Sequence, residues 1–270
     1  MKKPKISIIT VSWNDGATIG KTIESVINQN YKNIEHIIID GASNDETLDI
    51  IKTYEDFIAY WISEPDSGIY AAMNKGIQAS TGDVLYFLNA DDVFVDSKVL
   101  TEIAEVFSLN PQVDYVYGGI FYKDPYGVKN YNLLMMEEIS ESDFIKGKMI
   151  RHQALFVKRE IFRELKNFNE NLRIASDLDF EYKMLKSKKK GLFVKRVITI
   201  MSSDGISSNI DACLIEKTQL MRKYFGGSVA VKYKIYRSFK NRILKFLMAT
   251  GLIKGVLFLR KLLNIRKTLY

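Results

Sequence analysis

The sequence has a single cysteine, few prolines and no long apolar run. Because Cys213 is alone, an internal disulfide is excluded. Four prolines and sixteen glycines among 270 residues exclude collagen-like and low-complexity architectures. Met1 to Lys5 lead straight into a predicted strand without the apolar stretch of a secretion signal, so we expect a reducing, cytoplasmic setting. Since 47% of the residues are hydrophobic, the chain can bury a full core, and we expect one large domain with an appendage.

Acidic residues are almost missing from the C-terminal part. Residues 214–270 hold fourteen Lys or Arg and one acid, Glu216, a net charge of +13, which leaves −6 for residues 1–213 because the whole chain carries +7. Lys245, Lys254 and Arg260 interrupt the apolar residues of this tail, so no run reaches the roughly 18 residues of a membrane span. The pattern predicts basic amphipathic helices, which suit the anionic inner face of a membrane, where the protein would be peripheral.

Two other partners also suit the tail. A solvated face that packs on the body, or on a sister subunit in a homodimer, is the first alternative. Nucleic acid is the second, but no nucleic-acid-binding motif accompanies the charge, so we expect no nucleic-acid partner. We place the boundary between body and tail at residues 213 and 214.

Strand-like and helix-like segments alternate along the body. The predicted strands are residues 5–13, 34–39, 58–62, 84–88, 114–122, 128–135 and 192–200. The predicted helices are residues 17–29, a segment that opens at 43–46, residues 70–79, residues 97–107 and a short helix after Val157. This alternation predicts an α/β fold with a mainly parallel, doubly wound, Rossmann-like sheet, followed by a C-terminal helical extension.

Polar side chains follow three of the predicted strands where each strand ends. They are Trp13 and Asn14, then Asp40, then Asn89, Asp91 and Asp92. The carboxyl ends of parallel strands meet at one edge of a sheet, which is where open α/β sheets bind ligands. Carboxylates are ligands for Mg²⁺ or Mn²⁺, and such a cation lets an acidic pocket accept a diphosphate.

The alternatives at this edge are structural. Asp40 and the Asp91–Asp92 pair also suit ordinary turns, and Trp13 suits core packing. Neither a Walker-type loop nor a dinucleotide-binding glycine fingerprint is present, so a phosphate ligand would be held largely through the metal.

Four segments in this order resemble family 2 glycosyltransferases of the nucleotide-sugar-binding A-type fold, over residues 5 to about 205. They are Val11-Ser-Trp-Asn14, Ile38-Ile-Asp-Gly-Ala-Ser-Asn-Asp45, Ser63 to Gly76, and Leu88-Asn-Ala-Asp-Asp92. The resemblance implies that residues 1–213 form a catalytic domain that binds a nucleoside diphosphate sugar, with UDP expected. It also implies that Asp91 holds the cation between the two phosphates and that Asp92 either supports the metal through water or caps the turn.

The resemblance implies substrate contacts for a further set of side chains. These are Trp13, Asn14 and Asp40 around the base and ribose, Asp66 facing the donor, Asn89 at the first position of the Asp-x-Asp motif, and His152 near acceptor or phosphate. A structural role is the alternative for His152, and we interpret His36, within an apolar strand, as structural. Ala71 stands where close relatives often carry an acid, so no contact is carried over to it.

A proton acceptor is expected in the second half of the body. Asp177 aligns with the second residue of the family's Glu-Asp motif, in which Ser176 replaces the Glu. Asp177 is therefore our candidate general base. Asp179 and Glu181 are its competitors, although residues i and i+2 point to different sides of a helix.

The function implied is an inverting, metal-dependent transfer of one sugar to a hydroxyl of a lipid-linked or oligosaccharide acceptor in bacterial surface-polysaccharide synthesis. Residues 202–208 resemble a flexible loop near the active site in this family, and we expect it to close over the donor. A nucleotidyltransferase on a similar sheet and a membrane-bound scaffold with a decayed site are the alternatives.

Overall fold

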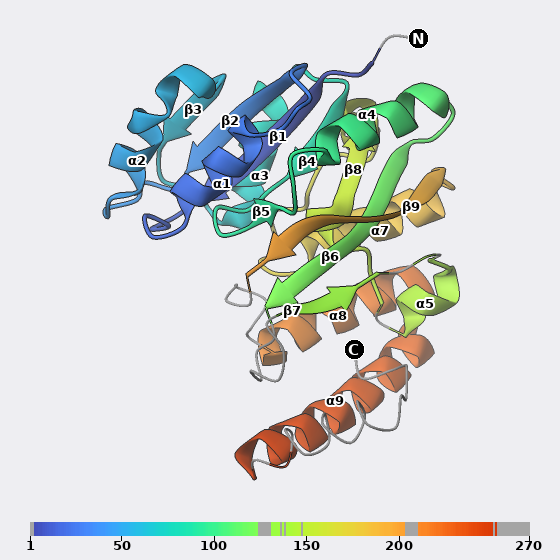
Figure 1. Cartoon of the computed structure of the whole chain (residues 1–270). Helices are drawn as coiled ribbons and strands as arrows, with labels where there is room; N and C mark the ends of the chain where they lie inside the picture. Colours follow the sequence, from blue (N-terminus) through green and yellow to red (C-terminus); the bar gives the residue numbers. More distant parts are fainter. Residues whose placement is uncertain are drawn as a thin grey trace.

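The computed structural model describes residues 3–123, 131–135, 137, 139–146, 148–202, 210–250 and 252. These residues form a nine-stranded mixed sheet with helices on both faces (Figure 1). The strand order is β3-β2-β1-β4-β8-β6-β9-β5, and β7 pairs with β6. The predicted turn at 123–127 and the predicted closing loop at 202–208 lie almost wholly outside the described residues.

The first half of the chain is the alternating part that the sequence predicts. Its strands are β1 (Ile6–Ser12), β2 (Ile34–Asp40), β3 (Tyr60–Ser63) and β4 (Val84–Phe87), and they pair in parallel. The connections contain α1 (Ile19–Ile27), α2 (Thr47–Thr53), the short 3₁₀ helix η1 (Glu55–Phe57) and α3 (Ile69–Ala79). The α/β class is confirmed.

The second half of the sheet is largely antiparallel, which the sequence did not predict. Antiparallel pairs join β8 (Leu155–Lys158) to β4 and to β6 (Tyr115–Lys123), β7 (Tyr131–Leu134) to β6, and β5 (Val93–Phe94) to β9 (Gly191–Met201). Only β6 and β9 pair in parallel. The remaining helices are α4 (Val99–Leu109), α5 (Glu141–Ile145), η2 (His152–Ala154), α6 (Arg159–Glu164), α7 (Ser176–Lys186), α8 (Ile210–Phe225) and α9 (Gly227–Ala249).

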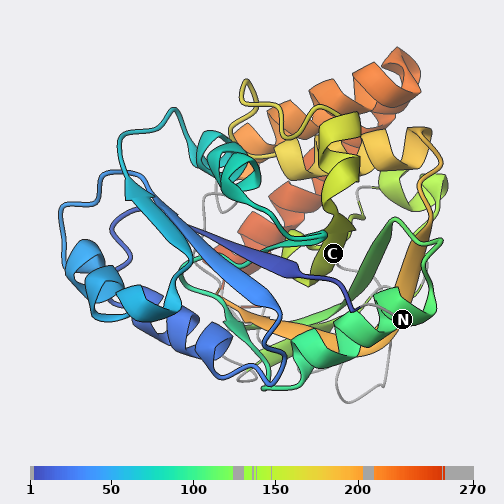
Figure 2. The same ribbon diagram turned by 90° about the horizontal axis from the view of Figure 1, so that it is seen from above.

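Two apolar cores lie on the two faces of the sheet, because successive side chains of a strand point to opposite faces. In β1, Ile6 and Ile8 pack with α4, whereas Ile9 and Val11 pack with α3, α6 and α7. Figure 2 shows α1, α2 and α4 on one side of the sheet and α3, α6 and α7 on the other. Since both faces are covered, every residue of β1 is buried, and its carboxyl end opens at the edge of the sheet.

The first part of the tail packs against the body, whereas most of α9 lies apart from it. Leu220 and Met221 of α8 and Tyr233 of α9 are buried in one cluster with Leu178 and Tyr182 of α7. The predicted boundary at residue 213 therefore falls within α8. Farther along, α9 runs below the sheet, apart from its strands (Figure 1).

Among the residues that the structure describes, no helix combines the length and the apolar character needed to cross a bilayer.

Candidate active site

The ends of β1, β2 and β4 lie side by side. Ser12 pairs with Asp40 across β1 and β2, and Ile9 pairs with Phe87 across β1 and β4. The residues that follow these strands, Trp13 and Asn89 among them, therefore gather at one edge of the sheet, as the sequence predicts.

Asp40 is fully buried and accepts four hydrogen bonds. Its Oδ1 accepts from the hydroxyls of Ser12 (2.9 Å) and Ser43 (2.6 Å), and its Oδ2 accepts from the Ser43 amide (2.9 Å) and the Ser63 hydroxyl (2.7 Å). Both oxygens are thus used within the protein. Asp40 ties the ends of β1, β2 and β3 together.

Trp13, Gly41 and Asp66 form an open surface beside these strand ends. The Trp13 side chain is 68% exposed. A Cβ added to Gly41 would lie 3.1 Å from Asp66 Oδ2 and 3.5 Å from Trp13 Cδ1, so the glycine leaves room between the indole and the carboxylate. Asp66 is itself exposed, and its Oδ1 accepts from the Gly68 amide at 2.7 Å.

Asn14 shapes the same edge. Its backbone has a positive φ of 56°, a conformation that Asn tolerates better than most residues. Its Oδ1 accepts from the Asn44 amide at 2.9 Å, and its own amide donates to Ser43 Oγ at 2.8 Å. These bonds join the turn after β1 to the turn after β2.

Several carboxylates crowd the edge. Burial raises the pKa of Asp15, and the charges of Asp91, Asp45 and Asp40 raise it further. Burial, followed by the charge of Asp91, raises the pKa of Asp92 to about 8. A positive ligand would relieve this repulsion.

The loop that carries Asp91 and Asp92 is held by neighbouring elements. The Thr22 hydroxyl of α1 donates to the carbonyls of Ala90 (2.9 Å) and Asp92 (2.8 Å). Asp92 Oδ1 accepts from the Ser202 amide at 3.0 Å. Asp92 Oδ2 is buried and accepts no hydrogen bond from any described residue.

These oxygens fit a divalent cation in part. Mg²⁺ and Mn²⁺ prefer carboxylate oxygens as ligands. The buried Asp92 Oδ2 has no hydrogen-bond donor among the described residues, and a cation could take the place of that missing partner. No group of three or more His, Cys, Asp or Glu side chains suited to a metal occurs in the described part of the chain. A cation held here would therefore need water or phosphate oxygens to complete its coordination.

Asp177 lies at the start of α7, and His152 links it to the edge of the sheet where β1, β2 and β4 end. Its Oδ1 accepts from Tyr70 Oη (3.2 Å) and from the Leu178 amide (2.8 Å), and its Oδ2 lies 3.4 Å from His152 Nδ1. On the other side of the imidazole, His152 Nε2 lies 3.4 Å from Asn89 Nδ2. One side chain thus connects the Asn89–Asp92 loop of the first half with α7 of the second.

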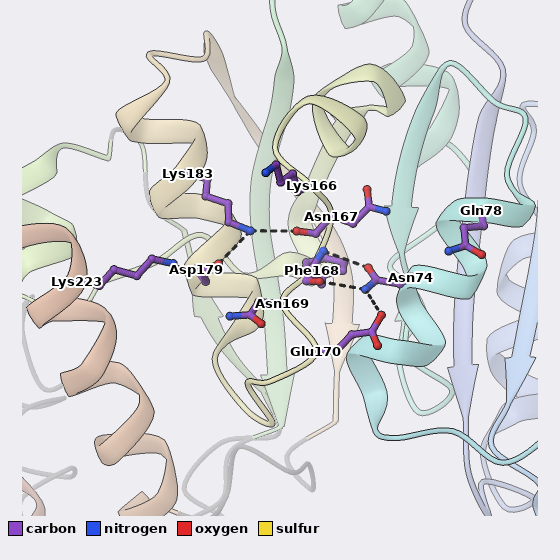
Figure 3. Close-up of a pocket in the computed structure, with 10 residues that line it drawn as sticks. All are labelled: Asn74, Gln78, Lys166, Asn167, Phe168, Asn169, Glu170, Asp179, Lys183 and Lys223. Atoms are coloured by element: carbon purple, nitrogen blue, oxygen red, sulfur yellow. Dashed lines mark hydrogen bonds and ion pairs between the residues drawn. The ribbon is translucent and has the colours of Figure 1, made fainter.

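The competitors of Asp177 point elsewhere. Asp179 pairs with Lys183 (3.1 Å) and Lys223 (2.8 Å) and faces a separate pocket of about 460 Å³ (Figure 3). Glu181 is buried, and its Oε2 accepts from the Ile150 amide at 2.9 Å. Burial, followed by the charge of Asp177, raises the pKa of Glu181 well above its ordinary value. Of these three carboxylates, Asp177 is the one that lies beside His152.

The family model described as "Glycosyl transferase family 2" matches residues 7–166, which run from β1 through α6. The chain belongs to glycosyltransferase family 2. It is therefore a glycosyltransferase, and the prediction of an enzyme of this class is confirmed.

Two curated relatives agree. An uncharacterised glycosyltransferase of Mycobacterium tuberculosis is 34% identical over 185 residues, which cover 66% of this chain and 67% of the relative. A PGL/p-HBAD biosynthesis glycosyltransferase of Mycobacterium bovis is 26% identical over 225 residues, which cover 82% of this chain and 85% of the relative.

Solved structures of similar fold include S. aureus TarS 1-349 in complex with UDP-GlcNAc, with a TM-score of 0.65, 15% identity and coverage of 87% of this chain and 72% of that one. Another is the mannosyltransferase PcManGT from Pyrobaculum calidifontis with GDP-Man and Mn²⁺, with a TM-score of 0.65, 15% identity and coverage of 96% and 81%. The chain spans only 42% of the longer TarS chain. At these identities the likeness shows the fold, which is the A-type glycosyltransferase fold.

Three features of this glycosyltransferase site were not predicted from the sequence. Tyr70 holds Asp177, Gly41 opens the surface beside Trp13, and Glu216 of α8 accepts from the amides of residues 173–175 at 2.9 Å each. Tyr70 lies within the family-like segment from Ser63 to Gly76, and Glu216 is the single acid of residues 214–270, so the sequence carries a signal for both.

Proposed function

We propose that this glycosyltransferase transfers a sugar from a nucleoside diphosphate sugar, preferably a UDP-sugar, to a hydroxyl of a lipid-linked or oligosaccharide acceptor, with inversion. The observation that supports it best is His152, which contacts Asn89 at the acidic edge and Asp177 on α7. With a divalent cation bound, the acidic edge can accept the diphosphate of the sugar donor. The Asp177–His152 pair provides a proton acceptor beside it. The setting proposed is bacterial surface-polysaccharide synthesis.

The donor base would lie over Gly41. Trp13 offers an exposed aromatic face, and Asp66 offers a carboxylate oxygen to an N–H of the base. Asn89 Oδ1, which is buried and accepts no hydrogen bond from the described residues, suits a ribose hydroxyl. Asp40 and Asn14 act indirectly, because their own hydrogen bonds hold the turns that form this surface.

The cation would be Mn²⁺ or Mg²⁺, held by Asp91 with Asp92 in support. When bound, such a cation neutralises the charge that develops on the departing diphosphate. The sequence provides no phosphate-binding loop as a substitute. Two proteins of similar fold, one in complex with UDP-GlcNAc and one with GDP-Man and Mn²⁺, are consistent with this donor class.

The tail would attach the enzyme to the inner face of the plasma membrane as a peripheral protein. On α9, Ile235, Phe239 and Phe246 are 65%, 65% and 61% exposed. No acid follows Glu216 in the sequence, so the charged side chains near this apolar face are all cations. That combination suits an anionic lipid surface. A homodimer through the same face is the competing use.

A donor panel tests the proposal. Purified protein is combined with Mn²⁺ and, separately, with UDP-, GDP- and dTDP-sugars, and thermal stabilisation and slow donor hydrolysis are measured. We expect a UDP-sugar to give the largest response, and we expect Asp91→Asn to abolish the Mn²⁺-dependent part of it. Asp49→Asn changes an exposed acid of α2 and is the matched control. An unchanged response in Asp91→Asn would remove the metal assignment.

A further inference from the structure

A second polar pocket lies on the side of the sheet that α3, α6 and α7 cover. Its volume of about 460 Å³ is within the range of ligand sites. Figure 3 shows lysines of α7 and α8 on one side of it and amide side chains of α3 on the other, with residues 166–170 between them. Because Asp177 and Asp179 are two positions apart on α7, they point to different sides of that helix, and only Asp179 lines the pocket.

The lining of this pocket excludes an apolar ligand. Among the ten lining residues that the structure describes, Phe168 alone is apolar. Phe168 is buried, and its ring packs against the rings of Phe162 and Phe180 in the core. The other lining residues are amides, lysines and acids. The ligand must therefore offer hydrogen-bonding groups around most of its surface.

Asp179 holds two lysines at one wall of the pocket. It is fully buried, its Oδ1 accepts from Lys223 Nζ at 2.8 Å, and its Oδ2 lies 3.1 Å from Lys183 Nζ. Burial acts to raise the pKa of Asp179, but the two lysines outweigh burial and lower the pKa, so the carboxylate stays ionised. Lys183 Nζ also donates to the Asn167 carbonyl at 3.2 Å. An ammonium group has three N–H donors, so each lysine keeps at least one for a ligand.

Lys166 adds a third cation. Its side chain is exposed and has no acidic partner among the described residues. Glu170 is the second acid of the lining and lies on the side of α3, where its Oε1 accepts from Asn74 Nδ2 at 2.7 Å. Three lysines and two acids leave an excess of positive charge, which lies around Asp179. That wall suits an anionic group.

Other groups of the lining suit hydroxyls. Asn167 Oδ1 is buried and accepts no hydrogen bond from any described residue, an arrangement that costs free energy unless a ligand donates to it. Gln78 is exposed on the opposite wall and provides both a donor and an acceptor. A sugar ring, whose hydroxyls donate and accept, matches this mixture of groups.

We propose that this pocket is a second ligand site of the enzyme and binds an anionic sugar, that is, a sugar unit that carries a phosphate or a carboxylate. The lysines around Asp179 would hold the anionic group, and Asn167 and Gln78 would bind hydroxyls. Such a sugar has two sources, a unit of an acidic glycan and a free sugar phosphate. The glycan is favoured because Asn74 lies one turn of α3, about 6 Å, after Tyr70, which holds Asp177. That choice of source rests on the proposed function.

Isothermal titration calorimetry of the full chain tests the ligand class. The probes are glucose 6-phosphate, glucose, inorganic phosphate, galacturonate and the acidic trisaccharide trigalacturonate. We expect glucose 6-phosphate to bind about tenfold or more tightly than glucose and than inorganic phosphate. Inorganic phosphate that binds as tightly as the sugar phosphate would show an adventitious ion only. Binding of neither glucose 6-phosphate nor an acidic saccharide would also overturn the proposal.

The saccharides distinguish the two sources. Trigalacturonate that binds more tightly than galacturonate supports a glycan. Binding of glucose 6-phosphate without binding of trigalacturonate would keep the anionic-sugar site and reject the glycan as its source.

Variants place the binding in the pocket. We expect Lys166→Asn to raise the dissociation constant of glucose 6-phosphate about tenfold, because a cation without an acidic partner is removed. Lys188→Asn is the matched control, since Lys188 is also exposed, has a similar positive φ (53° against 62° at Lys166) and lies outside the pocket. Lys183→Met is a second variant that leaves Asp179 paired with Lys223, and it should also weaken binding. Unchanged affinity in both pocket variants would overturn the proposal.

Free UDP separates this site from the donor site. Saturating UDP should leave the affinity for glucose 6-phosphate unchanged, because the two ligands bind at different places. If UDP displaces glucose 6-phosphate, the probe occupies the donor site and the proposal is wrong. Failure of every nucleotide sugar to stabilise the protein, with binding of glucose 6-phosphate retained, would instead count against the proposed function.

Discussion

His36 is buried in β2, where its Nε2 lies 3.0 Å from Thr10 Oγ1. Burial lowers its pKa to about 3, against an ordinary value near 6.5. Between these two pH values the unfolded chain binds a proton that the folded chain does not. Stability should therefore fall as the pH falls through this window.

We expect His36→Gln to flatten that dependence. The free energy of unfolding of the wild type, measured by urea denaturation from pH 7 to 5, should fall more steeply than that of the variant, by up to about 1.4 kcal/mol per pH unit. His152 is present in both proteins, so its contribution cancels. Parallel curves would show that burial does not hold His36 neutral.

The positions of the site carboxylates could be predicted from the sequence, whereas their contacts could not. The position of Asp91 after a buried strand, and of Asp177 at the start of a helix, could be predicted from sequence patterns and family resemblance. The four internal hydrogen bonds of Asp40 could not, because their donors come from three separate turns and strands. The contact of Asp177 with Tyr70 spans 107 positions and depends on how α3 packs beside α7.

Glu216 joins the tail to the helix that carries Asp177. From α8 its two oxygens accept from the amides of Arg173, Ile174 and Ala175, which immediately precede α7. We expect Glu216→Ala to lower the free energy of unfolding by about 1–3 kcal/mol, because three amides lose a charged acceptor. Donor hydrolysis should fall as well, because the loop positions Asp177.

Thermal melts and hydrolysis rates of the purified variant check this prediction. The control is Ile215→Ala, the preceding residue of α8, whose side chain is 60% exposed. It should leave both quantities close to those of the wild type. If the two variants behave alike, the capping of this loop by Glu216 does not matter.

Strong periodicity predicted the regular elements well. Apart from η1 and β5, the strands and helices up to α4 lie within a few residues of their predicted ranges, because most of them bury a face or stripe of apolar residues. The weak points were the short strands. β5 has two residues, too few for a period to show. The antiparallel pairing of β5 and β8 depends on partners far along the chain.

The distribution of charge over the molecule predicts a vesicle-binding experiment. The intact protein should sediment with vesicles that contain phosphatidylglycerol and not with pure phosphatidylcholine, and high salt should weaken binding. The double substitution Ile235→Ser and Phe239→Ser should release it, because it removes two exposed apolar side chains of α9.

Phe57→Ser is the matched control, because Phe57 is also exposed (62%) but lies in η1 of the body. Sedimentation velocity distinguishes the alternative. If the double variant still binds vesicles but changes from dimer to monomer, the α9 face joins two subunits, and the membrane proposal is wrong.

Trp13 gives the enzyme an intrinsic optical probe. The chain has two tryptophans, and the other, Trp61, lies within β3 and is partly covered. An indole that is two-thirds open to water should change its emission when a flat aromatic ring stacks on it. Titrating free UDP, GDP or dTDP and recording the emission would rank nucleotides by affinity before any acceptor is known, with Trp13→Phe giving the background signal.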